Sequence, residues 1–292
     1  MIENFLAVLS ASPTLLVGLC VFLGLLIGSF LNVVIYRVPV MMERGWKQEA
    51  REILELPAED DGKIFNLVTP RSRCPKCDHA IAWYENIPVL SWLVLKGKCK
   101  GCATPISKRY PIIEVASGVL AGLCAWHFGY GPWLAFTLFA TWTLLAAAMI
   151  DADTTLLPDS MNYPLLWAGL LAALLGVSPV SLPDAVVGAM AGYLSLWSVY
   201  WLFKLLTGKE GMGYGDFKLL AALGAWTGWQ YLPLIILLSS VVGLVFTLIA
   251  TLFGGEKRTQ IPFGPYLAAA GWIALLWGDT IVSSYLGMFR IS

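Results

Sequence analysis

The chain has 292 residues, of which 58% are hydrophobic and only 13% are charged, and its mean hydropathy is +0.72. These values exclude an ordinary soluble domain and predict an all-α polytopic membrane protein. The net charge is zero. We expect the lipid bilayer to surround the protein and expect no nucleic-acid partner.

Eight apolar stretches approach the roughly 20 residues that a helix needs to cross the hydrocarbon. The boundary between the sixth and seventh is the least defined, because only Gln230, Tyr231 and Pro233 mark it. No basic residue precedes Arg37, so the first stretch lacks the basic region of a cleaved signal and is expected to be a true transmembrane helix. The eight expected spans are 14–36, 111–129, 132–150, 160–177, 183–206, 217–232, 233–253 and 262–286.

Basic residues are concentrated in a few loops, which predicts the orientation of the chain. With the N-terminus outside, the inside loops are 37–110, 151–159, 207–216 and 254–261, and these loops with their flanks hold 18 of the 19 Lys and Arg. Cytoplasmic loops carry an excess of Lys and Arg. The sequence therefore predicts a periplasmic N-terminus and cytoplasmic placement of these four loops.

The first cytoplasmic loop is expected to begin with an amphipathic helix, MMERGWKQEAREILEL, lying on the membrane surface. The rest of the loop is too short to form its own hydrophobic core and would need another stabilising interaction, such as a bound metal. Four cysteines, Cys74, Cys77, Cys99 and Cys102, form a CxxC-x21-CxxC pattern there, which predicts a closed tetrahedral zinc site. The alternatives are reduced cysteines in a flexible loop or a redox pair. His79 is interpreted as a bystander, and Cys20 and Cys124 as buried, inert thiols.

Two acids, Asp151 and Asp216, adjoin apolar runs on the same predicted side of the membrane. A carboxylate at the edge of the hydrocarbon is unfavourable, so such residues indicate function. Two transmembrane helices separate them, so they can meet. Two close carboxylates share one proton, and the pair can then activate water and polarise a peptide carbonyl.

Other interpretations of these acids remain open from the residues alone. They could cap helices or pair with Lys204 or Lys218, or serve as the proton relay of a transporter. A third hypothesis is a zinc-loop docking protein without chemistry. Asp159 is expected as a helix N-cap or first-turn acid, and Asp153 as solvated.

Small residues have two expected roles. Glycines before Asp216, in GKEGMGYGD, would let a substrate chain lie against the backbone, although an ordinary flexible loop is the alternative. Gly28, Ser29 and Asn32 share a helix face that suits helix packing in lipid, and Arg37 would anchor the cytoplasmic end of that helix.

These motifs, together with GSFLNVVIYR, MIDADTTLLPD and GYGDFKLLAALGAW, resemble the type IV prepilin peptidases over nearly the whole chain. GYGD fits the GxGD signature of intramembrane aspartyl proteases. The resemblance implies a bifunctional enzyme of the bacterial inner membrane. It would cleave the basic leader of type IV prepilins and type II secretion pseudopilins after a glycine, at the cytoplasmic face, and then N-methylate the new N-terminal residue with S-adenosylmethionine.

The same resemblance assigns residues and regions. Asp151 and Asp216 match the catalytic acids, and Gly97 matches a glycine important for methyl transfer. The expected organisation is a periplasmic N-terminus and first helix over 1–36, a zinc-binding cytoplasmic domain with the methyltransferase region over 37–110, and a seven-helix protease domain over 111–292. Independently of the resemblance, the negative charges of Glu55, Glu59, Asp60 and Asp61 suggest the hypothesis that this stretch attracts the basic leader.

Overall fold

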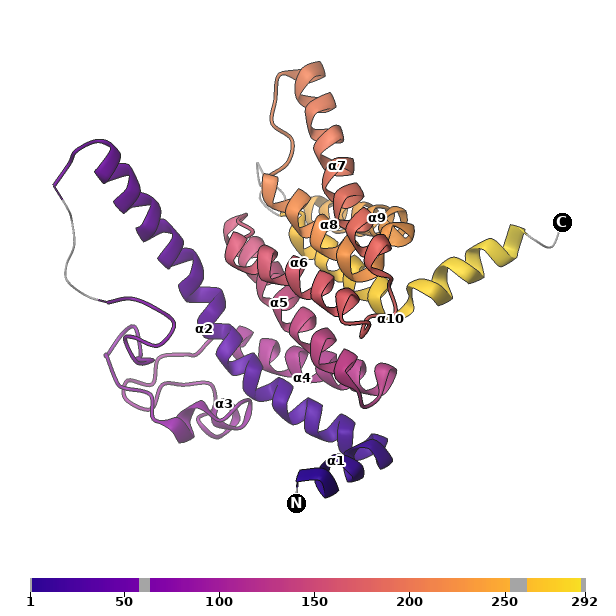
Figure 1. The fold of residues 1–292 in the computed structure, drawn as a ribbon. Helices are drawn as coiled ribbons and strands as arrows, with labels where there is room; N and C mark the ends of the chain where they lie inside the picture. Colours follow the sequence, from indigo (N-terminus) through magenta and orange to yellow (C-terminus); the bar gives the residue numbers. More distant parts are fainter. Residues whose placement is uncertain (1, 58–63, 253–261, 290–292) are drawn as a thin grey trace. The chain divides into compact units, whose positions relative to one another are not determined.

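The computed structural model describes residues 2–57, 64–252 and 262–289, and its regular structure there is helical, apart from two isolated β-bridges (Figure 1). The all-α prediction is thereby confirmed. The chain divides into two compact units, residues 1–130 and 131–292. Glu59, Asp60 and Asp61, expected to attract a leader, and the basic residues Lys257 and Arg258 lie outside the described residues.

Six helices in the described part are long and apolar enough to cross a bilayer, so the chain is a multi-pass membrane protein. These are α2 (Pro13–Ile53), α4 (Arg109–Phe128), α5 (Pro132–Thr154), α7 (Leu182–Thr207), α9 (Leu232–Leu252) and α10 (Gly264–Phe289). The other two expected spans are also helical but shorter: α6 (Asp159–Leu174) has 16 residues and α8 (Tyr214–Thr227) has 14.

In the first unit, α1 (Ile2–Ala11) precedes α2, and small residues bring α2 against α4. A Cβ on Gly24 or Gly28 would lie 2.7 Å from the backbone of α4, and Ser117 donates a 2.6 Å hydrogen bond to the Gly24 carbonyl. Asn32 donates to the Tyr110 carbonyl at 3.2 Å. The predicted packing face is therefore confirmed. In lipid there is no hydrophobic driving force between helices, so close backbone contact stabilises this helix pair instead.

The structure corrects the expected separate surface helix that would follow the first span. Residues 40–53 continue α2, which runs through Pro39 as one helix of 41 residues. A proline lacks the backbone N–H that would donate a hydrogen bond within the helix. Here the helical turns on both sides of Pro39 keep α2 continuous. Arg37 is buried and donates to the carbonyls of Asn66 and Pro70 at 2.7 and 2.6 Å. It thus ties α2 to the start of the cysteine-bearing segment.

In the second unit, the other helices enclose α8. Gly188 of α7 and Gly224 of α8 approach so closely that neither position has room for a Cβ. On another side, Trp226 donates a 2.8 Å hydrogen bond to the Leu165 carbonyl of α6. A helix that other helices enclose along most of its length need not match the bilayer thickness, which explains why α8 has only 14 residues.

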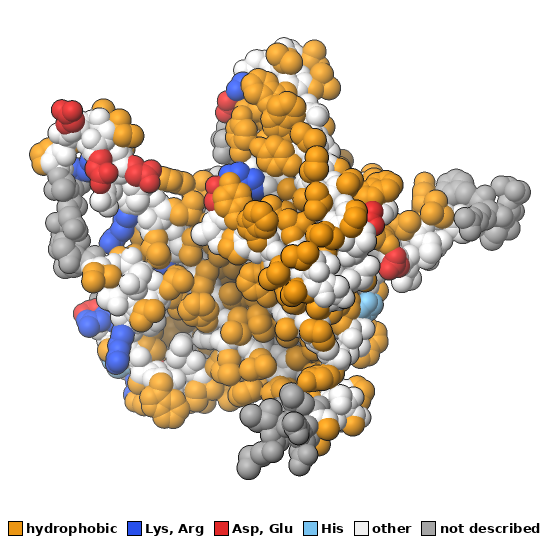
Figure 2. Space-filling model, viewed as in Figure 1, with side chains coloured by type: hydrophobic (Ala, Val, Ile, Leu, Met, Phe, Trp, Pro, Cys, Tyr) orange, Lys and Arg blue, Asp and Glu red, His pale blue; other side chains and the backbone are white. Residues whose placement is uncertain are grey.

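A short 3₁₀ turn, Trp229–Tyr231, separates α8 from α9 at the break that Gln230, Tyr231 and Pro233 predicted. The outer faces of the long helices are apolar, and Figure 2 shows hydrophobic side chains over α7. Leu202 of α7 and Phe246 of α9, for example, are each 60% exposed. Such surfaces suit contact with lipid.

Candidate active site and metal centre

Asp151 lies in the last turns of α5 and is only 4% exposed. The helix ends just beyond it, where Thr155 adopts the left-handed conformation (φ 54°) and donates its N–H to the Asp151 carbonyl at 2.8 Å. The side-chain Oδ2 of Asp151 accepts a 2.8 Å hydrogen bond from the backbone N–H of Gly264, where α10 begins. This carboxyl group is therefore held at the junction of two helices.

Asp216 lies in the first turn of α8 and is 7% exposed. Gly213 is the N-cap of this helix, and its backbone N–H faces the Asp216 carboxylate. The N-terminus of a helix favours a negative charge. The carboxyl groups of Asp216 and Asp151 lie close enough for a direct electrostatic interaction. The second unit therefore brings the two predicted acids together in a water-poor setting.

Leu157, in the turn after α5, separates the glycines that border the two acids. A Cβ on Gly215 would lie 2.6 Å from the Leu157 Cβ, and one on Gly264 would lie 3.1 Å from the Leu157 Cδ2 and 2.7 Å from the Asp151 Oδ2. Gly264 and Leu157 were not among the predicted site residues. The signal for Gly264 is a glycine between Pro262 and Pro265 just before an apolar run.

The lysines that were considered as partners of the acids have other partners. Lys218 donates to both oxygens of Asp159 at 2.7 and 2.8 Å, and Lys204 donates to Glu210 at 2.8 Å. Asp159 is the first residue of α6, as expected for a first-turn acid. These contacts weigh against a simple ion-pair role for Asp151 and Asp216.

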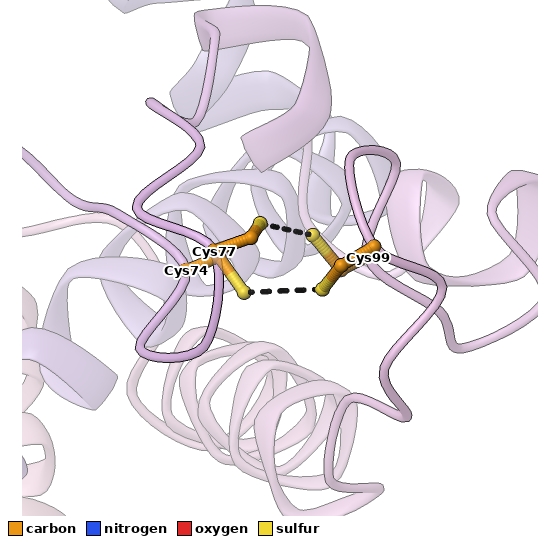
Figure 3. Close-up of side chains that lie close together, drawn as sticks. Cys74, Cys77 and Cys99 are labelled. Atoms are coloured by element: carbon orange, nitrogen blue, oxygen red, sulfur yellow. Dashed lines mark hydrogen bonds between the residues drawn. The ribbon is translucent and has the colours of Figure 1, made fainter.

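The four cysteines of the two CxxC pairs, which lie in the first unit, form one cluster, and their sulfurs all lie within 4.8 Å of one another. Figure 3 shows sulfurs turned toward each other from two loops. The sulfurs of Cys74 and Cys102 lie 3.8 Å apart, and those of Cys77 and Cys99 lie 3.9 Å apart. Tetrahedral zinc with Zn–S bonds of about 2.3 Å requires sulfur separations of about 3.8 Å. Two of the sulfur pairs match this separation, so the cluster could hold a metal.

The two CxxC loops have the same backbone design. Cys74 receives the N–H of Asp78 on its carbonyl and donates its own N–H to His79, and Cys99 does the same with Ala103 and Thr104. Asp78 and Ala103 both have positive φ, at 55° and 56°. Each loop therefore turns its two sulfurs to one side, which is the arrangement that a four-thiolate site needs.

His79 does not belong to the sulfur cluster, in keeping with its interpretation as a bystander to the metal. Its Nε2 instead lies 3.0 Å from Oε2 of Glu85, which also accepts the Ala82 N–H at 3.1 Å. The hydrogen bond from His79, the Ala82 N–H and the nearby Lys100 lower the pKa of Glu85 to about 2. Glu85 is therefore ionised at neutral pH.

Gly97 has a backbone conformation and a neighbour that both favour glycine. Its φ is +67°, and a Cβ there would lie 2.8 Å from Cζ2 of Trp92. Trp92 is fixed in turn by a 3.2 Å hydrogen bond from Nε1 to the Ile106 carbonyl. Gly97 therefore supports the tryptophan just before the second CxxC loop. Cys20 and Cys124 are buried, as expected, at 4% and 0% exposure.

Two family models match the chain. Residues 22–128 match the bacterial peptidase A24 N-terminal domain, and residues 138–248 match the type IV leader peptidase family. The first contains the cysteine cluster, and the second contains both acids.

Three relatives, each called prepilin leader peptidase/N-methyltransferase, are similar over almost their whole length. The protein of Stutzerimonas stutzeri is 60% identical over 97% of this chain and 98% of its own. The protein of Pseudomonas aeruginosa is 58% identical over 95% and 96%, and that of Neisseria gonorrhoeae is 51% identical over 94% of each chain. No solved structure matches the chain significantly.

Proposed function

Because the chain belongs to the type IV leader peptidase family, we propose that it is a bifunctional prepilin-processing enzyme. It cleaves the basic leader of type IV prepilins and type II secretion pseudopilins after a glycine, at the cytoplasmic membrane face. It then N-methylates the new N-terminal residue with S-adenosylmethionine. Relatives that share more than half of their residues with this chain carry both activities in their names.

The observation that carries the protease assignment is the meeting of two buried acids, Asp151 and Asp216, in one helical unit. Two carboxylates in a poorly solvated site are most stable when they share one proton. The ionised group takes a proton from water as the water attacks the scissile carbonyl, while the protonated group donates to the carbonyl oxygen. The N–H of Gly264 fixes one of the two carboxyl groups for this task.

The backbone around the acids explains how an extended substrate reaches them. Gly213 is exposed beside the Asp216 carboxyl group and carries no side chain that would block a peptide there. An extended peptide needs close approach to backbone groups, which glycine permits. The prepilin helix enters laterally from the lipid, and its leader junction then lies at the level of the acids.

The cysteine cluster is the structural zinc site in this proposal. Cys74, Cys77, Cys99 and Cys102 supply four thiolates, so the metal has no open position and stabilises the segment 37–110. That segment is the methyltransferase region, and Gly97 supports it through Trp92. S-adenosylmethionine supplies the methyl group that the new amine receives.

The proposed location is the bacterial inner membrane, with a periplasmic N-terminus and the acids facing the cytoplasm. The distribution of Lys and Arg supports this orientation. Residues 111–292 supply the seven helices of the protease part in this scheme. The transporter alternative finds no support, since the relatives are named as enzymes.

The proposal is tested with purified protein, a synthetic prepilin and isotope-labelled S-adenosylmethionine. Mass spectrometry reports leader loss and methylation separately. Asp151→Asn and Asp216→Asn are expected to abolish cleavage, while Asp153→Asn, which changes an exposed acid in the same turn, cleaves normally. Wild-type cleavage by either of the first two variants would disprove the assignment.

A further inference from the structure

The segment between α2 and α4 contains a cavity of about 290 Å³ that the protease chemistry does not use. One wall is apolar and consists of Ile87, Leu90, Val94 and Leu95, and Glu85, Lys100 and Tyr84 lie at its polar end. Small-molecule sites usually measure roughly 300–1,000 Å³. This cavity therefore suits a group of amino-acid size better than a whole nucleoside cofactor.

The polar end of the cavity holds a buried carboxylate, and one of its oxygens faces the exposed Lys100 side chain. The Glu85 side chain is 6% exposed, and its Oε2 is occupied by His79 and the Ala82 N–H. Its Oε1 is buried and receives no well-aligned hydrogen bond from any described residue. A buried carboxylate oxygen favours a cationic partner, and this oxygen has one in the ammonium group of the exposed Lys100 side chain.

Lys100 marks where such a group would lie. Its Nζ is 3.1 Å from Oε1 of Glu85 and 5.0 Å from the centre of the Tyr84 ring. A carboxylate and an aromatic face are the two partners that ammonium groups prefer. The Lys100 side chain is 51% exposed and flexible, so it can withdraw into water when another ammonium group arrives.

We propose that this cavity binds the free N-terminal residue of the cleaved substrate. The α-ammonium replaces Nζ of Lys100 against Glu85 and Tyr84, and the apolar side chain lies against Ile87, Leu90 and Val94. The inference rests on the proposed function, since leader cleavage creates both the new amine and the apolar residue that bears it. The cavity thereby holds the methyl acceptor within the segment assigned to methyl transfer.

The alternative ligand is the methionine end of S-adenosylmethionine, whose carboxylate would bind Lys100. The two ligands make opposite demands on this lysine. An incoming ammonium competes with Lys100 for Glu85, whereas an incoming carboxylate needs Lys100 as its partner. Removing the lysine charge therefore separates them.

The test measures equilibrium binding of a short apolar peptide with a free N-terminal phenylalanine to the zinc-loaded full-length protein. An N-acetylated peptide is the control ligand. Glu85→Gln keeps the side-chain shape and is expected to weaken binding of the free-amine peptide by roughly 10- to 100-fold. Lys100→Gln is expected to tighten it several-fold. Glu49→Gln, which removes an exposed carboxylate of α2, leaves it unchanged.

Zinc content and melting temperature establish that each variant is folded. The proposal is overturned if Glu85→Gln binds the free-amine peptide as tightly as wild type, if the acetylated peptide binds equally well, or if Lys100→Gln weakens peptide binding. Weaker S-adenosylmethionine binding by Lys100→Gln, with peptide binding unchanged, would also overturn it and assign the cavity to the cofactor. Failure of the wild-type protein to cleave or methylate a prepilin counts instead against the proposed function.

Discussion

The backbone N–H of Gly264 donates a 2.8 Å hydrogen bond to Oδ2 of Asp151, a residue 113 positions earlier in the chain. The bond joins the start of α10 to the end of α5. Any side chain at position 264 would begin 2.7 Å from the same oxygen, so the position combines a donor with a need for glycine. Gly264 is thus a positioning residue for one acid of the pair.

Gly264→Ala is expected to reduce the rate of leader cleavage by about 100-fold, because its Cβ displaces the Asp151 carboxyl group from its working position. Turnover of a synthetic prepilin, followed by mass spectrometry, measures the effect. Gly287→Ala is the matched control on the same helix, since nothing lies within 4 Å of a Cβ there. Equal turnover by both variants would show that the Gly264 contact does not position the acid.

Gly215→Ala is expected to impair cleavage through Leu157, since the new Cβ would lie 2.6 Å from the Leu157 Cβ. Leu157→Gly removes that Cβ together with the rest of the side chain and so relieves the contact. The double variant should therefore recover part of the activity, with a coupling of about 1–2 kcal/mol in activation free energy. A double-mutant cycle on cleavage rates measures this value. Strictly additive effects would argue against the contact.

Parts of the fold and of the site could be predicted because their signals are residue spacing and charge, which can be read directly from the sequence. The CxxC spacing predicted one cluster of four thiolates, and the basic loops predicted that Asp151 and Asp216 could meet. Hydropathy predicted α8 as a span but could not predict that other helices enclose it, because a helix buried among other helices is as apolar as one that crosses lipid. Gly264 was missed because a backbone N–H leaves no side-chain signal.

Metal removal should affect the two activities differently. Chelation, or Cys99→Ser, is expected to unfold the cysteine-bearing segment. Its hydrophobic core is small, so the metal bound by the sulfur cluster is needed to stabilise the fold. Methylation should be lost, while leader cleavage persists because the acids lie in the other unit. Native mass spectrometry should find one zinc per chain in the wild type and none in Cys99→Ser. Cys20→Ala, a buried thiol of α2, should keep its zinc, and a zinc-free wild type would contradict the prediction.

Gly97→Ala tests whether this glycine acts through Trp92 or by touching the cofactor. A left-handed backbone with a Cβ is unfavourable by about 1–3 kcal/mol, and the contact with Trp92 at 2.8 Å adds to the strain. We expect lower thermal stability of the cysteine-bearing segment and slower methylation, with normal cleavage. Gly45→Ala, where a Cβ meets nothing within 4 Å, should change neither property.

The background variant Trp92→Leu separates the two roles of Gly97. If Gly97 acts by supporting the tryptophan, the smaller leucine relieves the contact, and Gly97→Ala should then reduce methylation less than it does in the wild type. If Gly97 touches S-adenosylmethionine directly, the reduction should persist undiminished in the Trp92→Leu background. Methylation rates of the four proteins, measured on a leaderless peptide at saturating S-adenosylmethionine, decide between these outcomes.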